Sequence, residues 1–424
     1  MLLAAMSSPA DSPSVAVIGG AVAGAEVAGA LASRGVLVAV IEQNPRPYGK
    51  IEDGLPRWHL ALRRKEYQTI DGKLSHPNVA FVPLTSIGRD VSFRELTREW
   101  GFSAVVLACG AWRDRPLPVE GADAWVGRGL IYQNPFIVWF NHAGEKAYRG
   151  PVFEPRDGAI VVGGGLASID VVKVLMLETT RAKLRERGIE VPMVELEVKG
   201  IPKILAGHGI AWEDLGLAGC TLYYRRRAED MPLVEIPDGA TPERAAKVLA
   251  SRAKLLEKAM EKYRFQVETL CMPDAVVVEG ERLVGLRFRR TRADAGKIVP
   301  TDETFEARGP YVISSIGSIP EPIEGIETKG ELFRFTDWDL GRLDGHPNVF
   351  SAGNVVTGKG NIVASRKHAA AVASRVASEI AKLPPASGGA LERVRARVRE
   401  RQRAVGYTGD YASWMAKVTP PDLE

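Results

Sequence analysis

Cysteine is scarce in this 424-residue sequence, and its three copies, Cys109, Cys220 and Cys271, stand far apart. The sequence has no C-x-x-C motif, which argues against a disulfide-stapled fold, a zinc site and a redox-active disulfide. We therefore expect no metal site and a reducing, cytoplasmic environment.

Long apolar segments and a strong charge bias are also missing. No run approaches the length of about 18 apolar residues that a membrane helix needs. The first residues lack the basic start and apolar core of a secretory signal, and their Ser and Pro content predicts a frayed tail. The formal net charge of only +4 argues against a protein that coats nucleic acid, although a mildly basic surface would favour an acidic protein partner.

The stretch from Val15 to Gln43 carries the strongest pattern. Val15–Ile18 predicts a buried strand, Gly19–Gly24 a tight turn before a helix, and Val36–Ile41 a second strand followed by Glu42. Such a turn brings backbone N–H groups to a pyrophosphate, and the acidic residue accepts hydrogen bonds from an adenosine ribose. The stretch predicts a dinucleotide site, with Ala21 standing where the motif usually has its second glycine.

A second turn of the same kind follows the strand Ala159–Val162 and runs from Gly163 through Gly165 to Ser168. Serine stands there where glycine or alanine usually lets the helix pack on the strand. Two such turns in one chain are far more specific than one, and they predict two nucleotides that face each other.

The ribose-binding strand of this second unit, Cys220–Tyr224, ends in arginines and not in an acidic residue. Arg225 and Arg226 suit a 2′-phosphate, which guanidinium groups can bind bidentately. The alternative is a solvated basic turn. The phosphate interpretation requires residues 178–217 to be looped out as an insertion, because they separate the second turn from its strand.

Two more strand ends complete the pattern. Ala104–Cys109 predicts a strand that ends at Gly110, where a bound nucleotide would pass; we expect Cys109 to be a small buried residue and not a nucleophile. Asn348–Ser351 predicts a last strand that leads through a glycine-rich turn into an Ala-rich helix. The basic segment Leu391–Ala404 predicts a helix with a solvated face.

These motifs together resemble the two-dinucleotide flavoproteins and, among them, the NADPH–adrenodoxin (ferredoxin) reductases. The resemblance covers residues 15–376 and extends beyond the glycine turns to Tyr48-Gly49 with Gly54–His59, Gly88–Ser92, Phe136–Asn141 and Arg225–Arg227. It implies FAD at the first turn and NADPH at the second. The implied fold is α/β, with two Rossmann-like dinucleotide-binding domains in the glutathione-reductase-like arrangement and a helical C-terminal extension.

The resemblance also implies which residues bind the cofactors. FAD contacts fall on Gly19, Ala21, Gly24, Glu42, Thr85 (at the adenine), Gly110, Gly353, Asn354, Gly360 and Ile362. NADPH contacts fall on Gly163, Gly165, Leu166, Ala167, Ser168, Arg225 and Arg226. His59 is the candidate for a catalytic proton network near the flavin, with a purely structural hydrogen-bonding role as the alternative. Ala21, Trp58 and Asn354 depart from the family pattern.

The expected domains follow from these assignments. Residues 1–13 form a disordered tail, and residues 14–112 with 335–383 form a discontinuous FAD domain. Residues 113–334 form the NADPH domain with its insertion at 178–217, and residues 384–424 form a linker and a basic C-terminal helix and tail.

Three functions agree with this pattern. The first is hydride transfer from NADPH to FAD and electron transfer onward to an acidic ferredoxin-type iron–sulfur protein. The second is an NADPH-dependent flavoenzyme that acts on a small molecule, and the third is a non-enzymatic nucleotide-binding subunit or sensor. We expect no nucleic-acid partner and no membrane-spanning segment. The sequence leaves the oligomeric state open between a monomer and a dimer.

Overall fold

The computed structural model describes residues 13–420, except residues 238, 295–296, 359 and 384–388. The described chain divides into two compact units. Unit 1 comprises the residues up to Leu55, His59–Arg113, and the residues from Ser318 onward; unit 2 comprises Pro56–Trp58 and Asp114–Gly317. The chain thus returns to unit 1 at Ser318, and the described C-terminal segment belongs to unit 1.

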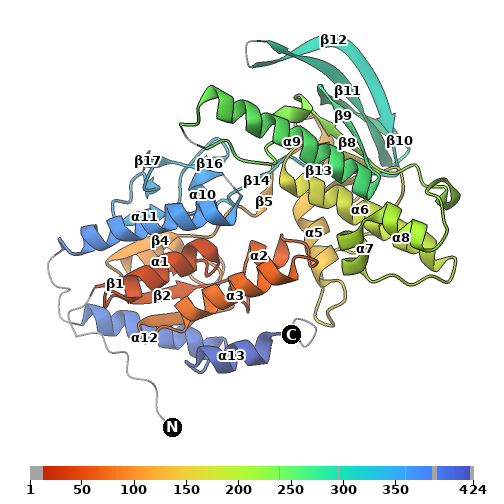
Figure 1. Cartoon of the computed structure of the whole chain (residues 1–424). Helices are drawn as coiled ribbons and strands as arrows, with labels where there is room; N and C mark the ends of the chain where they lie inside the picture. Colours follow the sequence, from red (N-terminus) through yellow and green to blue (C-terminus); the bar gives the residue numbers. More distant parts are fainter. Residues whose placement is uncertain (1–12, 238, 295–296, 359, 384–388, 421–424) are drawn as a thin grey trace. The chain divides into compact units, whose positions relative to one another are not determined.

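Unit 1 is built on a five-stranded parallel sheet in the order β19-β4-β1-β2-β3. Figure 1 labels three of its strands, β1, β2 and β4. Every residue of the three inner strands, β4, β1 and β2, is buried, as expected for a parallel sheet that is covered on both faces. The strands are β1 (Ser14–Ile18), β2 (Leu37–Ile41), β3 (Val79–Val82), β4 (Ala104–Leu107) and β19 (Val349–Ser351).

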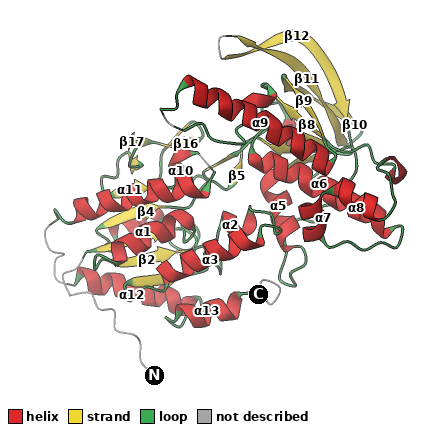
Figure 2. Cartoon of the chain, viewed as in Figure 1, coloured by secondary structure: helices red, strands yellow, loops and turns green. Residues whose placement is uncertain are grey.

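Helices cover both faces of this sheet (Figure 2). Because side chains alternate along a strand, Val15 and Val17 face one core with helices α1 and α11, whereas Ala16 and Ile18 face another with α4 and α12. The helices of unit 1 are α1 (Val22–Ala32), α2 (Lys50–Asp53), α3 (Leu60–Leu74), α4 (Phe93–Arg98), α10 (Asn354–Thr357), α11 (Ile362–Ile380), α12 (Ala390–Ala404) and α13 (Tyr411–Val418). Its short strands are β14 (Ser318–Ile319), β15 (Thr328–Lys329), β16 (Leu332–Phe333), β17 (Phe335–Asp337) and β18 (Arg342–Leu343).

Unit 2 contains a second five-stranded parallel sheet, in the order β6-β13-β7-β8-β9, and an antiparallel sheet β10-β11-β12. The strands are β6 (Leu130–Tyr132), β7 (Ile160–Gly163), β8 (Thr221–Tyr224), β9 (Gln266–Thr269), β10 (Cys271–Glu279), β11 (Arg282–Asp294), β12 (Lys297–Arg308) and β13 (Val312–Ser315); β5 (Arg113–Asp114) lies at the boundary. The helices are α5 (Gln133–His142), α6 (Leu166–Arg185), α7 (Met193–Lys199), α8 (Ile201–Gly207) and α9 (Pro242–Tyr263), with short 3₁₀ turns at Ala122–Trp125, Glu213–Leu215 and Ala228–Asp230.

Residues 178–217 lie between β7 and β8, which pair directly with each other, so the chain makes an excursion there, as the phosphate interpretation requires. The excursion is largely helical: α6 continues through Arg185 instead of ending near residue 177, and α7 and α8 follow it. Met193, Leu196, Ile201 and Leu205 from this segment are buried in the core of unit 2. These apolar residues are three to five positions apart, so they lie on the buried sides of two short helices. The many charged residues between them obscured this pattern in the sequence.

The antiparallel sheet of unit 2 begins with a hairpin at Glu279, where β10 pairs with β11, and β12 pairs with the other side of β11. Helix α12 has the predicted solvated face, on which most of its arginines are exposed, and its other face buries Leu391, Val394 and Val398 in the core of unit 1. No helix in the described chain is both long and apolar enough to cross a membrane.

Candidate dinucleotide-binding sites

The predicted FAD-contacting residues of unit 1 gather at one edge of its sheet. Gly19, Glu42 and Thr85 follow strands β1, β2 and β3, and Gly110 and Gly353 follow β4 and β19. Since all five strands are parallel, their carboxyl ends meet at the same edge, which is where open α/β sheets bind ligands. The sequence motifs therefore converge on a single site.

Two glycines of the first turn, Gly19 and Gly24, have no room for a side chain. Gly19 has φ +99°, and a β-carbon there would lie 2.6 Å from the carbonyl oxygen of Ala108; one on Gly24 would overlap the carbonyl oxygen of Gly19. Helix α1 begins directly after this turn, with no side-chain cap and no acidic residue in its first turn. Its N-terminal N–H groups and positive dipole end suit a pyrophosphate.

The Ala21 methyl group is accommodated by a second glycine. A β-carbon on Gly49 would lie 2.9 Å from the Ala21 Cβ, so the two residues are in close contact. Gly49 itself has φ 51° and ψ −133°, a backbone conformation that favours glycine. The turn can therefore hold alanine at position 21, where the motif usually has glycine, because Gly49 has no side chain.

Glu42 is buried and directed at the backbone of the site. Its carboxylate oxygens accept hydrogen bonds from the N–H groups of Gly20 and Asn44, at 2.8 and 2.9 Å. Burial raises the pKa of Glu42 to about 7 in spite of these two bonds. Ribose hydroxyl groups that donate to the carboxylate would favour its charged form, as the expected role at the end of β2 requires.

The turn after β19 carries an unsatisfied polar atom. The Asn354 Oδ1 atom is buried and has no hydrogen-bond partner among the described residues. Gly353 has φ +78° and packs so closely on helix α1 that a β-carbon would lie 2.6 Å from the Ala23 Cβ. Its N–H donates to the Nδ1 atom of His368, at 2.9 Å. A ligand group that donates to Asn354 would satisfy this acceptor, so the residues present fit a bound dinucleotide.

The remaining candidate residues of unit 1 differ in exposure and in hydrogen bonding. Gly110 has φ +71° and little around it, and Gly360 is exposed. Ile362 begins α11, which is capped by the Asn361 side chain. Thr85 is buried, with its hydroxyl group already engaged in two hydrogen bonds. His59 is half-buried at the start of α3, and its side chain does not cap that helix.

The second glycine turn, in unit 2, has the same close packing. A β-carbon on Gly163 would overlap the Ser315 carbonyl oxygen, and one on Gly164 would overlap the Tyr224 ring, whereas the space around Gly165 is open. Gly165 precedes the twenty-residue helix α6, whose first residues Leu166 and Ala167 are exposed. The open backbone and the helix N-terminus again suit a phosphate group.

Ser168 occupies the third position of this turn without displacing the helix. The side chain is buried, and its hydroxyl group donates to the carbonyl oxygen of Gly165, at 2.6 Å. Because a β-carbon on Gly163 would lie only 2.7 Å from the Ser168 Cβ, the glycine provides the room that the serine needs.

The three arginines after β8 have different surroundings. Arg227 forms a two-bond ion pair with Asp230 and a further contact with Glu229. The Arg225 and Arg226 side chains have no ion-pair partner among the described residues, whereas their carbonyl oxygens accept bonds from Thr291 and Leu270. The backbone is thus held in place while two guanidinium groups remain available to an anion.

None of the cysteines has the properties of a nucleophile. Burial raises the pKa of the Cys109 and Cys271 thiols to about 12 and raises that of Cys220 further. All three are free thiols. The expectation that Cys109 is not a nucleophile agrees with this environment.

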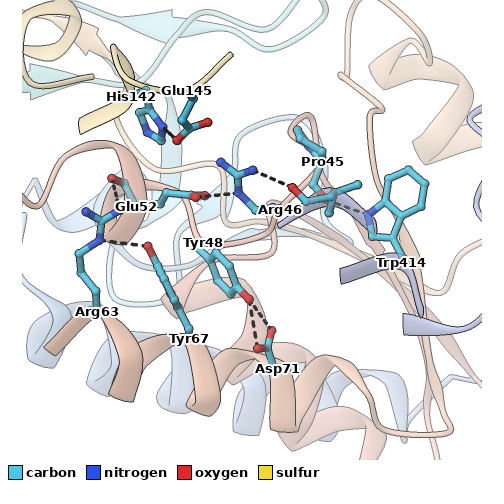
Figure 3. A network of polar contacts seen from close by, with 11 residues as sticks. Pro45, Arg46, Tyr48, Glu52, Arg63, Tyr67, Asp71, His142, Glu145 and Trp414 are labelled. Atoms are coloured by element: carbon cyan, nitrogen blue, oxygen red, sulfur yellow. Dashed lines mark hydrogen bonds and ion pairs between the residues drawn. The ribbon is translucent and has the colours of Figure 1, made fainter. Parts of the chain in front are cut away.

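The structure adds residues that the motifs did not reveal. In Figure 3, the Tyr48 hydroxyl group donates to Asp71, Arg46 pairs with Glu52 at 2.6 Å, and the Trp414 indole donates to the Pro45 carbonyl oxygen. These bonds join the loop after β2 to helix α3 and to the C-terminal helix α13. His368 and Arg401 also form hydrogen bonds with candidate residues of the site, to Gly353 and Thr85. No sequence motif singles them out, because His368 lies within an Ala-rich helix and Arg401 is one of several arginines in α12.

Known proteins resemble this chain in sequence over part of its length, and no family model matches it. Cindoxin reductase from Citrobacter braakii is 32% identical over 168 residues, which cover 38% of this chain and 34% of that protein. The mitochondrial NADPH:adrenodoxin oxidoreductase of Salvelinus fontinalis is 25% identical over 318 residues, which cover 72% of this chain and 59% of that protein. The chain therefore matches only about a third to three fifths of these two relatives.

The fold has a relative among solved structures. The structure of Mycobacterium tuberculosis FprA in complex with NADPH matches 92% of this chain and 91% of its own, with a TM-score of 0.67 and 18% sequence identity. The predicted α/β fold with two Rossmann-like domains is confirmed by this match and by the two parallel sheets. The predicted resemblance to NADPH–adrenodoxin reductases is likewise confirmed by the sequence relatives.

Proposed function

We propose that this chain is an FAD-dependent oxidoreductase that takes hydride from NADPH and passes electrons to a ferredoxin-type iron–sulfur protein. The observation that carries the proposal is that the two glycine turns are followed by strands that end in residues of opposite charge. Buried Glu42 follows β2, and Arg225 and Arg226, whose side chains have no ion-pair partner among the described residues, follow β8. The first suits a free ribose, and the second a 2′-phosphate.

The chain's own residues would hold two dinucleotides. In unit 1, the first turn and α1 would bind the FAD pyrophosphate, Glu42 its ribose, and Asn354 a hydrogen-bond donor of the ligand. In unit 2, Gly163–Ser168 would bind the NADPH pyrophosphate and Arg225 with Arg226 the 2′-phosphate. When bound, the nicotinamide and flavin supply the hydride and electron chemistry, and the protein orients them and excludes competing reactions. His59 is proposed as a proton-network residue and not as a nucleophile.

The names of the relatives support a protein acceptor. They include NADPH:adrenodoxin oxidoreductases and probable ferredoxin–NADP reductases, the latter from Mycobacterium leprae at 32% identity over 162 residues. We propose an acidic iron–sulfur protein as the partner because the net charge of this chain is +4. A reducing, cytoplasmic location fits the three free thiols.

Anaerobic titration tests the first half of the reaction. The purified protein should carry a yellow flavin that NADPH bleaches at lower concentration than NADH does. A flavin that NADPH leaves oxidised would contradict the proposed hydride transfer.

Reduction of cytochrome c tests the second half. With NADPH in excess, the rate should depend on added ferredoxin and fall as the ionic strength rises, because complementary charges are screened by salt. Rapid NADPH turnover with a small-molecule acceptor and no response to ferredoxin would favour the alternative, a flavoenzyme that acts on a small substrate.

A further inference from the structure

The C-terminal segment wraps around the edge strand of unit 1. On one face of the sheet, α12 buries Leu391 and Val398. On the other face, Tyr407 and Tyr411 pack edge-to-face against Phe81 of β3, at 5.9 and 5.3 Å between ring centroids. The Gln402 side chain donates to the carbonyl oxygen of Phe81, at 2.7 Å, and thereby covers part of the exposed edge.

Arg401 extends this contact to the turn that follows β3. Its Nε atom donates to the Thr85 hydroxyl oxygen at 2.9 Å, and its Nη2 atom donates to the Leu84 carbonyl oxygen at 3.2 Å. The same guanidinium group pairs with Asp90, at 3.0 Å. One side chain of the C-terminal segment thus binds the Leu84–Thr85 turn at two points and Asp90 at a third.

Leu84 is held in an unfavourable backbone conformation. Its φ of 51° lies in the left-handed region that non-glycine residues seldom adopt. The N–H group of Leu84 donates to the Asn44 carbonyl oxygen, and its own carbonyl oxygen accepts from Arg401. Its side chain nevertheless remains 38% exposed. Strained residues that are held from both sides are typical of ligand sites.

The same turn is bonded directly to Glu42. The Thr85 N–H group donates to the Glu42 carbonyl oxygen at 2.9 Å, and the Thr85 hydroxyl group donates to the Pro83 carbonyl oxygen at 3.0 Å. With its N–H and hydroxyl hydrogen both engaged, Thr85 has no donor left for an adenine. The exposed apolar side chain beside it belongs to Leu84.

We infer that Arg401 is a positioning residue for the adenosine end of the unit 1 dinucleotide, acting through the Leu84–Thr85 turn, and that Leu84 covers the adenine. This inference rests on the proposed function, since it requires FAD in unit 1. It moves the adenine contact from Thr85 to its neighbour and makes the C-terminal segment part of the cofactor site.

The test compares two flavins that differ only at the adenosine end. FAD and riboflavin 5′-phosphate share the flavin and the first phosphate, so a defect confined to the adenosine site weakens FAD alone. Apoprotein of the full chain is titrated with each flavin, followed by flavin fluorescence, for the wild type, Arg401→Ala and Leu84→Asn. Asparagine tolerates positive φ, so Leu84→Asn keeps the backbone and removes the apolar cover. Arg403→Ala is the matched control, because Arg403 is exposed on the same helix and its side chain has no hydrogen-bond or ion-pair partner among the described residues.

Each result bears on the inference. Arg401→Ala and Leu84→Asn should each weaken FAD binding by about tenfold or more, with riboflavin 5′-phosphate unchanged and the control like the wild type. A parallel loss for both flavins, or unchanged FAD binding in both variants, overturns the inference and leaves the proposed function intact. A wild-type protein that binds no FAD overturns both.

Discussion

A β-carbon on Gly49 would lie only 2.9 Å from the Ala21 Cβ, so the Ala21 methyl group leaves no room for a side chain at Gly49. Ala21 belongs to the glycine turn before α1, and Gly49 precedes α2. The residue types at positions 21 and 49 are therefore coupled: the Ala21 methyl group in the turn requires a glycine in the loop after β2.

Gly49→Ala should destabilise the apoprotein by about 2 kcal/mol, because the new methyl group meets Ala21 and the positive φ is strained. In the Ala21→Gly background the clash disappears and only the backbone strain remains. Urea unfolding of both single variants and the double variant should give a coupling energy of about 1 kcal/mol. Gly330→Ala, at φ +65° with no atom within 4 Å, serves as the control for strain alone. Strictly additive effects would contradict the contact.

The raised pKa of Glu42 predicts a pH dependence of apoprotein stability. The folded protein holds this proton up to about pH 7, whereas an unperturbed glutamate releases it near 4.5. Protonated Glu42 therefore contributes its full stabilisation of the folded state below pH 4.5. This stabilisation, about 3 kcal/mol of the free energy of unfolding, is lost as the pH rises to about 7. Glu42→Gln, which carries no charge, should gain stability relative to the wild type across this window in urea unfolding. A constant difference between the two proteins from pH 4.5 to 8 would contradict the shift.

His368 predicts a stability that changes with pH in the opposite direction, falling as the pH falls. Burial lowers the pKa of His368, and its neutral Nδ1 atom accepts the Gly353 N–H bond. The folded protein thus takes up this proton at lower pH than the unfolded chain does, so this contribution to stability is lost as the pH falls below about 6.5. FAD affinity should decline in the same range, because protonation removes the acceptor that orients Gly353.

His368→Gln isolates this contribution. At pH 7.5 the variant should bind FAD more weakly by about 1 kcal/mol, and its affinity should change less than that of the wild type between pH 7.5 and 5.5. Parallel pH profiles for the two proteins, measured by flavin fluorescence, would show that His368 is not the titrating group.

The arginines after β8 predict cofactor selectivity. Arg225→Ala and Arg226→Ala should each raise the KM for NADPH by about tenfold to a hundredfold, the effect of a charge-assisted hydrogen bond, and change that for NADH little. Arg227→Ala should affect both nucleotides little, because Arg227 is already paired with Asp230. Stopped-flow reduction of the flavin measures the effect, and equal losses for NADPH and NADH would refute the 2′-phosphate assignment.

The cysteines predict resistance to alkylation. A thiol whose pKa is about 12, such as Cys109, is almost entirely protonated at neutral pH and reacts slowly. Iodoacetamide at pH 7.5 should leave NADPH-dependent flavin reduction intact, and Cys109→Ala should retain the activity. Rapid inactivation that this substitution prevents would imply a catalytic thiol.

Sequence patterns were sufficient where the fold repeats a local rule. Apolar β-branched runs, glycine turns and strand-end residues such as Glu42 lie close together in the chain, so spacing alone placed both βαβ units. Patterns were insufficient in segment 178–217, where charged residues between Met193 and Leu205 hid the apolar stripe of short packed helices.

The sequence by itself determined the two nucleotide turns, because a strand, a turn and a helix of neighbouring residues suffice to form each. Only the tertiary structure decided that Gly49 accommodates Ala21, that His368 orients Gly353, and that Arg401 reaches the turn at Leu84. The hydrogen bond from Arg401 to Leu84 joins residues 317 positions apart, and no local pattern can specify such a pair. Such contacts exist because a sheet edge must be covered, and the chain covers the edge of β3 with its last helices.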